Sequence, residues 1–292
     1  MSTLRLFSPA KINLFLAITG RRQDGFHDLL SLAAPLDFGD TLEVEPADRI
    51  SLCCDDPKLP VDESNLVLKA AVAFQVRTGW KGGAEFRLRK RIPFGAGLGG
   101  GSSNAVATLR ALNELAGELL DPPALREVAA SLGADCSLFV ENSPVIMRGR
   151  GDMVERLTEA EHRRIRGKRV LVFKPGFGVL TSWAYGQMVA NTGNYLNAEA
   201  AENQLNQWRN GDHCSLESLT FNNMEPVVYA KYPALPAMHE ILRRRFGLKP
   251  RMSGSGSASF ALLEDNMPTE DIVAWIYEAW GRTAFVISST LV

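Results

Sequence analysis

The glycine-rich segment at residues 93–105, PFGAGLGGGSSNA, constrains the fold of this chain more than any other stretch of its sequence. Five glycines fall within residues 95–101, between a strand predicted to end at Lys90 and a helix predicted to begin near Ser103. Because glycine lacks a Cβ, such a run lets backbone amides approach a ligand closely. Ordering the run costs conformational entropy, which argues against the alternative of a flexible surface loop capped by serine.

Two known types of nucleotide-binding loop do not fit this segment. Gly95, Gly97 and Gly100 match the pattern GxGxxG. A dinucleotide-binding loop would also require a βαβ unit with an acidic residue at the end of its second strand, about 20 residues further on. The residues at that point, ELLDPPAL, are predicted to end one helix and begin another. The ATPase P-loop pattern GxxxxGK[ST] fails because no lysine follows the glycines.

The residues that follow the glycines predict a phosphate site. Ser102, Ser103 and Asn104 place hydroxyls, an amide and unpaired N–H groups at a helix N-terminus, where the helix dipole also favours an anion. A second glycine–serine turn, Ser253–Ser257, supplies further backbone donors. Three interpretations of this turn stay open: it holds a second phosphate, it braces the glycine-rich segment, or it is an ordinary loop.

Composition limits the class of protein. The 292 residues are 46% hydrophobic and 22% charged, which is typical of a globular protein long enough for two lobes. A net charge of −1 argues against a protein that binds nucleic acid through its phosphates. The four cysteines form no CxxC pair, and Pro9, Lys11 and Asn13 interrupt the N-terminal apolar run, which indicates a strand rather than a signal peptide or membrane span. We therefore expect a cytoplasmic protein with no nucleic-acid or membrane partner.

Hydrophobic periodicity predicts a chain of strands and helices with a β-rich first third. Alternation in Lys11–Ile18 predicts a strand that carries Lys11 and Asn13 on one face. Further strands are predicted at Leu29–Leu36, Thr41–Glu45, Ile50–Cys54, Ala84–Lys90, Pro144–Met147, Val170–Lys174 and Ala284–Ser288. Helices are predicted at Asn65–Thr78, from Ser103, from Asp121 to Gly133, and at Thr181–Ala190, Ala198–Asn210, Ala234–Phe246 and Thr269–Trp280.

Three segments resemble, in order, the three motifs of the GHMP kinase superfamily. They are SPAKINLFL at residues 8–16, PFGAGLGGGSSNA, and MSGSGSASFALL at residues 252–263. More narrowly, the first segment, the turn RRQDGFHD at residues 21–28 and GADCSLF at residues 133–139 resemble the kinases of 4-diphosphocytidyl-2-C-methyl-D-erythritol, which act in the non-mevalonate isoprenoid route. This resemblance implies ATP-dependent phosphorylation of the 2-hydroxyl of that small-molecule substrate.

The resemblance also implies the α+β fold class, in the form of the two-lobed GHMP kinase fold. An N-terminal α/β nucleotide-binding lobe would span residues 1–155, and a C-terminal α+β lobe residues 156–292, with the active-site cleft between them. ATP would bind to the loop residues Pro93, Phe94, Gly95, Ala96, Gly97, Leu98, Gly99, Gly100, Gly101, Ser102, Ser103 and Asn104. ATP would bring Mg²⁺, held mainly by phosphates and water, with a possible ligand from Ser102 or Ser103 and no dedicated protein metal site.

Lys11 and Asp135 would form the catalytic pair. Asp135 would accept the proton of the attacking hydroxyl, and Lys11 would keep that carboxylate ionised and favour the developing charge. Each residue also has an ordinary structural alternative. An aspartate after Gly133 is commonly a helix cap, and Lys11 alone could be an exposed strand lysine.

Asn13, Phe26, His27 and Tyr185 would bind the substrate. A histidine between two aromatic rings suits a nucleobase, whereas a lone histidine in a turn is commonly exposed to solvent. Position 26 is phenylalanine where tyrosine is frequent, and the stretch Asn191–Cys214 matches no pattern that we can place.

Two rival functions remain open. Another kinase of the superfamily would act on homoserine, mevalonate or a sugar, but a small uncharged alcohol does not need the aromatic turn at Phe26 and His27. A catalytically silent ATP or ligand sensor of the same fold is the second rival. The presence of both Lys11 and Asp135 argues against it.

Overall fold

A computed structural model describes residues 3–211 and 214–292 of the chain. The chain divides into two compact units, and each is made of segments that are separate in sequence. Unit 1 holds the described residues up to Ala10, together with Phe38–Ile92 and Gly99–Ser143. Unit 2 holds Lys11–Asp37, Pro93–Leu98 and the described residues of Pro144–Val292. The lobe boundary expected at residues 155 and 156 stays a prediction, as does a cleft between lobes.

Two long strands, β1 (Leu4–Arg21) and β2 (His27–Ala47), run through both units. They belong to a seven-stranded sheet with the order β3-β4-β2-β1-β8, in which β5 also pairs with β2 and β6. Two strands were expected where β2 is continuous. The glycine in the middle of β2, Gly39, marks a close backbone approach rather than a break, because a Cβ there would lie 2.3 Å from the carbonyl oxygen of Ser8.

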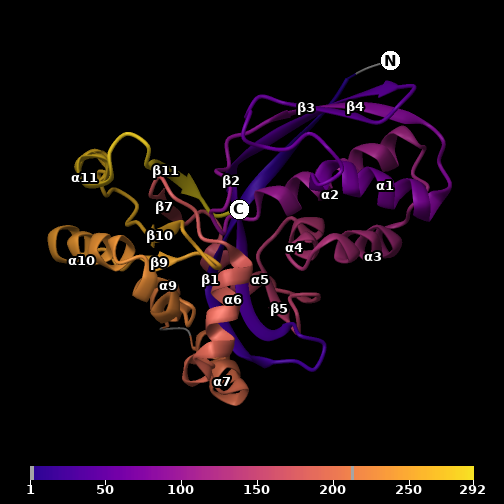
Figure 1. Cartoon of the computed structure of the whole chain (residues 1–292). Helices are drawn as coiled ribbons and strands as arrows, with labels where there is room; N and C mark the ends of the chain where they lie inside the picture. The colour runs from indigo at the N-terminus through magenta and orange to yellow at the C-terminus, as the bar shows by residue number, and fades with distance from the viewer. Residues whose placement is uncertain (1–2, 212–213) are drawn as a thin grey trace. The chain divides into compact units, whose positions relative to one another are not determined.

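Unit 1 packs helices against the part of this sheet formed by β3 (Ser51–Cys54) and β4 (Gly83–Arg89). The helices are α1 (Leu66–Thr78), α2 (Gly100–Leu115), α3 (Pro122–Leu132) and α4 (Cys136–Glu141), and α1 lies beside α2 (Figure 1). Side-chain caps start two of them: Asn65 accepts from the Val67 amide and Asp121 from the Ala124 amide. The core includes the fully buried Phe74.

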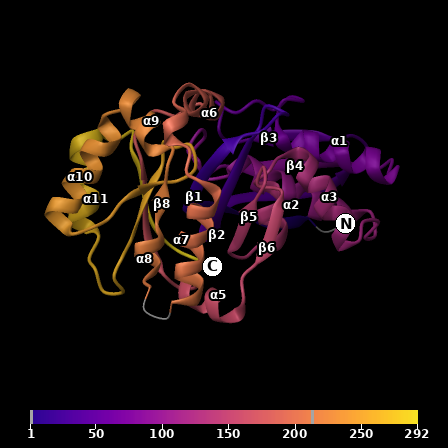
Figure 2. The same cartoon turned by 90° about the horizontal axis from the view of Figure 1, so that it is seen from below.

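Unit 2 contains the second sheet, with the antiparallel order β11-β7-β10-β9. Its strands are β7 (Arg169–Lys174), β9 (Arg251–Met252), β10 (Ser259–Leu262) and β11 (Phe285–Thr290). Helices α10 (Ala234–Phe246) and α11 (Glu270–Trp280) lie next to each other at this sheet (Figure 2). Phe173 of β7, Leu242 of α10 and Ile276 of α11 share one buried cluster.

The remaining elements of unit 2 are mostly short. They are β5 (Val145–Arg148), β6 (Met153–Arg156), β8 (Phe221–Asn222), α5 (Glu159–Ile165), α6 (Thr181–Ala190), the 3₁₀ helix η1 (Thr192–Asn194), α7 (Ala198–Asn210), α8 (Leu216–Leu219) and α9 (Glu225–Lys231). Periodicity predicts α6 and α7 but misses most of the others, because an element of two to seven residues shows too few repeats.

The fold class is α+β, as predicted. Among the described helices, none combines the length and the apolar character needed to cross a membrane.

Candidate active site

The glycine-rich loop and the glycine–serine turn are in direct contact within unit 2. The Ala258 amide donates to the carbonyl oxygen of Ala96 at 3.0 Å, and the Ser253 hydroxyl donates to that of Gly97 at 3.0 Å. A Cβ on Gly97, whose φ is +74°, would lie 2.2 Å from the carbonyl oxygen of Ser253. Three interpretations of the turn were left open. This packing agrees with the one in which the turn braces the glycine-rich loop.

Lys11 on β1 joins the same cluster. Its amide donates to the Leu98 carbonyl at 2.9 Å, and its ammonium donates to Oδ1 of Asn13 at 2.6 Å. The side-chain amide of Asn13 in turn donates to the Ser31 hydroxyl at 2.9 Å. Hydrogen bonds therefore fix the side chains of Lys11 and Asn13 on their face of β1. Lys11 is only 3% exposed. The alternative of an exposed strand lysine is therefore wrong.

The start of α2, in unit 1, is held by polar side chains that point into that unit. The Ser8 hydroxyl donates to Ser103 at 2.9 Å, and the side-chain amide of Asn104 donates to Ser8 at 2.8 Å and to Asp40 at 2.9 Å. Lys90 also pairs with the fully buried carboxylate of Asp40. Because Ser103 and Asn104 use their side chains in this way, the groups of the first turn best placed to receive an anion are its backbone amides, which lack acceptors within the helix.

Asp135 stands immediately before α4. It occupies the N-cap position, but its backbone is helical and its side chain makes no capping hydrogen bond to α4. The next residue, Cys136, contacts the Ser102 carbonyl through Sγ at 3.7 Å, which places this end of α4 beside the first turn of α2. Burial raises the pKa of the Cys136 thiol to about 12. Lys11 belongs to the other unit, so the catalytic pair stays a prediction.

His27 lies among aromatic side chains in unit 2. Its ring centroid is 4.9 Å from that of Tyr185, and its Nε2 lies 3.1 Å from the hydroxyl of Tyr195. His27 is only 8% exposed, so the alternative of a solvent-exposed turn histidine is wrong. Burial lowers the pKa of His27, and the charge of Arg21 lowers it further. The imidazole is therefore neutral near pH 7.

Phe26 is placed differently from its neighbour. The residue is 55% exposed, and the guanidinium carbon of Arg150 lies 4.4 Å from the centroid of its ring. Tyr195 is the aromatic residue that the sequence analysis missed. It lies in the stretch 191–214 that matched no pattern, and the aromatic residue type was its only signal. The stretch also includes positions outside the described residues.

Comparisons with known proteins match both halves of the chain. The family models for the GHMP kinases N terminal domain and the GHMP kinases C terminal match residues 65–142 and 197–282. The 4-diphosphocytidyl-2-C-methyl-D-erythritol kinase of Protochlamydia amoebophila (strain UWE25) is 38% identical over 270 residues, which cover 92% of this chain and 87% of the relative. The chain belongs to this kinase family.

Solved structures agree with that assignment. A crystal structure of 4-(cytidine 5'-diphospho)-2C-methyl-D-erythritol kinase has a TM-score of 0.76 and 33% identity, and the match covers 99% of both chains. The homoserine kinase of Cytophaga hutchinsonii ATCC 33406 has a TM-score of 0.67 with 20% identity, covering 100% of this chain and 95% of that one. The second match shows the fold alone. The predicted superfamily and the prediction of an ATP-dependent kinase are confirmed.

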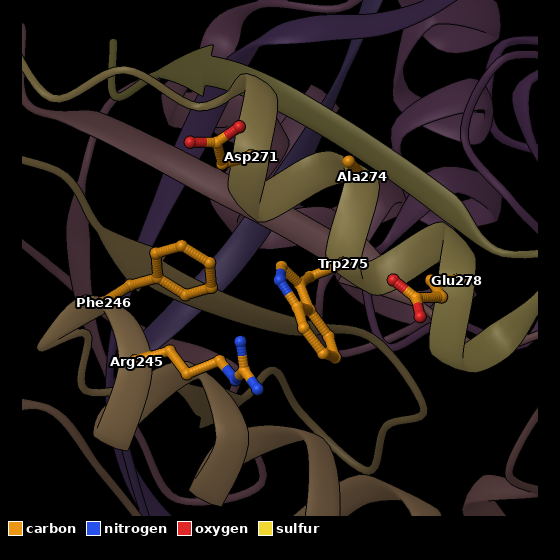
Figure 3. A pocket seen from close by; sticks show the side chains of 6 residues that line it. All are labelled: Arg245, Phe246, Asp271, Ala274, Trp275 and Glu278. Atoms are coloured by element: carbon orange, nitrogen blue, oxygen red, sulfur yellow. The ribbon is translucent and has the colours of Figure 1, made fainter.

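One pocket of this kinase, in unit 2, has none of the predicted site residues in its lining. It lies between α10 and α11, where the guanidinium of Arg245 stacks 3.8 Å from the ring centroid of Trp275 (Figure 3). Phe246, Asp271, Ala274 and Glu278 complete its lining.

Metal-ligating side chains do not gather in the part of the kinase that the structure describes. No three His, Cys, Asp or Glu residues there are arranged to hold a metal ion.

Proposed function

We propose that the chain transfers the γ-phosphoryl group of ATP to the 2-hydroxyl of 4-diphosphocytidyl-2-C-methyl-D-erythritol, a cytoplasmic step of non-mevalonate isoprenoid synthesis. One observation carries the choice of substrate: a buried, neutral His27 contacts the rings of both Tyr185 and Tyr195. A small alcohol such as homoserine has no base for such a cluster to recognise. The names of the relatives support the same substrate.

ATP would bind along residues 93–104. The amides of the loop and of the first turn of α2 would receive the phosphates, because helix N-termini offer unpaired donors and a favourable dipole. Ser103 and Asn104 would contribute by fixing the start of α2 through Ser8 and Asp40. Mg²⁺ would be held by the phosphates and water, and Ser102 is the better protein ligand because the Ser103 hydroxyl is already bonded. Bound there, the ion would neutralise phosphate charge.

Asp135 would accept the proton of the attacking hydroxyl. The 2-hydroxyl sits on the carbon that carries the methyl branch, so it is a tertiary alcohol, and its crowding makes positioning important. In a loose transition state the proton leaves late, so a carboxylate is a sufficient base. Lys11, oriented by its hydrogen bond to Asn13, would stabilise the negative charge that develops.

The base would be recognised by stacking and by one ring nitrogen. Aromatic contacts to a nucleobase contribute about 1–3 kcal/mol each. Because Nε2 of His27 is bonded to Tyr195, Nδ1 is the atom proposed to meet the polar edge of the cytosine. Phe26 would add an outer contact from its exposed position.

A coupled ADP-release assay across four alcohols tests this function. The proposal expects the specificity constant for 4-diphosphocytidyl-2-C-methyl-D-erythritol to exceed those for homoserine, mevalonate and galactose by at least about 100-fold. A larger constant for any of the other three would overturn the choice of substrate. ATP binding without ADP release on any alcohol would instead favour the silent sensor.

A further inference from the structure

A chain of polar side chains lies behind the glycine–serine turn, and the proposed chemistry does not use it. Nε2 of His239 lies 2.7 Å from the Ser259 hydroxyl, and Nδ1 lies 3.1 Å from the hydroxyl of Tyr229. Tyr229 is hydrogen-bonded to Glu225, whose Oε1 accepts the Met252 amide at 2.8 Å. This series of hydrogen-bonded side chains thus connects Ser259, through α10 and α9, to Met252.

Each hydrogen bond from Ser259 to Glu225 in this series of side chains can be assigned a donor and an acceptor, and all of them then point the same way, towards Glu225. Burial raises the pKa of Glu225, but the guanidinium of Arg251, 3.8 Å from its Oε2, favours the carboxylate. As a carboxylate Glu225 only accepts, so the Tyr229 hydroxyl donates to it and accepts from Nδ1–H of His239. Nε2 of His239 then accepts from Ser259. Burial lowers the pKa of His239 to about 3, with the charge of Arg251 acting in the same direction, so the ring is neutral as this arrangement requires. Every link is satisfied, which makes the chain a rigid connection.

The hydrogen-bonded series of side chains begins and ends at the two residues that flank the glycine–serine turn. Met252 and Ser259 are paired across β9 and β10, and residues 253–258 join them. The turn meets the ATP loop through Ala258 to Ala96 and Ser253 to Gly97, both at 3.0 Å. A displacement of the base of the turn is therefore passed to the loop backbone, because no flexible side chain intervenes at Ala96.

We infer that Glu225, Tyr229 and His239 are positioning residues that set the ATP loop by clamping both ends of the turn at residues 253–258. The inference rests on the proposed function, since it assigns the loop to ATP. None of the three touches a reacting atom. Their effect is on ATP affinity, and binding of the alcohol substrate through His27 and Tyr185 should be spared.

The experiment compares Tyr229→Phe with Tyr277→Phe. Tyr229→Phe keeps the ring and removes the hydroxyl that joins Glu225 to His239. Tyr277→Phe is the control, because Tyr277 lies on α11 in the same unit and is 37% exposed. Amide hydrogen exchange of the ligand-free proteins is read at residues 94–98 and 253–258, and the ATP dissociation constant is measured by calorimetry.

The inference expects exchange in both segments to rise about 10-fold in Tyr229→Phe, with a weakening of ATP binding of about 5- to 20-fold, while the Michaelis constant of the alcohol changes less than about 2-fold. Glu225→Gln should act in the same direction, because glutamine has only one acceptor oxygen for two donors, the Met252 amide and the Tyr229 hydroxyl. Unchanged exchange at residues 94–98 in Tyr229→Phe would overturn the inference, even if the melting temperature falls. Hydrogen exchange is measured without a ligand. A parent protein that fails to bind ATP would therefore refute the proposed function, and the exchange at residues 94–98 and 253–258 would still test whether the side chains position the loop.

Discussion

Gly97→Ala should separate the ATP loop from the turn that braces it. The new Cβ would lie 2.2 Å from the Ser253 carbonyl oxygen, about 1 Å closer than such atoms tolerate. Both partners are backbone, so the loop must move by about that distance. A shift of 1 Å is enough to break a charge-assisted hydrogen bond from an amide to a phosphate, which contributes about 1.5–3 kcal/mol. We expect ATP affinity to fall about 10- to 100-fold.

Gly79→Ala is the matched control for this variant. Gly79 ends α1 in unit 1, whereas Gly97 belongs to unit 2. Gly79 has a φ of +72°, close to the +74° of Gly97, but a Cβ there would meet nothing within 4 Å. Both variants therefore carry the same left-handed strain of roughly 1–2 kcal/mol, and Gly97→Ala alone carries the clash. Calorimetry with ATP and a urea titration of each protein separate the two effects. If Gly97→Ala and Gly79→Ala bind ATP equally well, the close packing of loop and turn does not set the ATP site.

Four further predictions follow from single residues. Asp135→Asn should lower kcat about 10²- to 10⁴-fold with little change in substrate KM, and retention of more than half the parent kcat would leave Asp135 no role as a base. His27→Ala should remove most of a preference for the cytidine over the uridine substrate, expected at about 10-fold or more, without changing ATP affinity, and a variant that still discriminates would exclude the histidine from base recognition. The folded pKa of His239 lies below its ordinary value of 6.5, so its stabilising contribution is present above that pH and is lost as pH falls towards about 3. Between pH 7 and 5.5 the parent should lose about 1 kcal/mol more unfolding free energy than His239→Gln, and parallel curves in urea would contradict this. At pH 8, Ellman's reagent should label the exposed Cys53 and spare Cys136 until the protein unfolds; equal rates for both thiols would show that Cys136 is accessible.

Local chemistry accounts for the parts of the fold that the sequence predicts well. Asn65 and Asp121 begin helices as caps because their side chains reach amides two or three residues ahead. The glycines of the loop are equally local, since left-handed φ values at Gly95, Gly97 and Gly99 need residues without a Cβ.

Contacts between distant segments account for what the sequence could not predict. The position of Ser103 and Asn104 after the glycines predicts phosphate ligands, and that role stays a prediction. The sequence does not predict that their side chains bond Ser8 and Asp40, which are 64 to 96 residues away in the chain. Tyr195 was missed for the same reason, because only the folded chain places its hydroxyl against His27, 168 residues earlier.

Phosphorus NMR of the reaction product tests the central claim most directly. The enzyme is incubated with ATP and 4-diphosphocytidyl-2-C-methyl-D-erythritol, and the new phosphomonoester resonance is recorded with and without proton decoupling. The 2-carbon carries no hydrogen, so a phosphate on it has no three-bond coupling to a proton. We predict one new phosphomonoester signal that stays a singlet without decoupling. A doublet or triplet would place the phosphate on a different hydroxyl, and no new signal beside unchanged ATP would contradict the kinase assignment for this substrate.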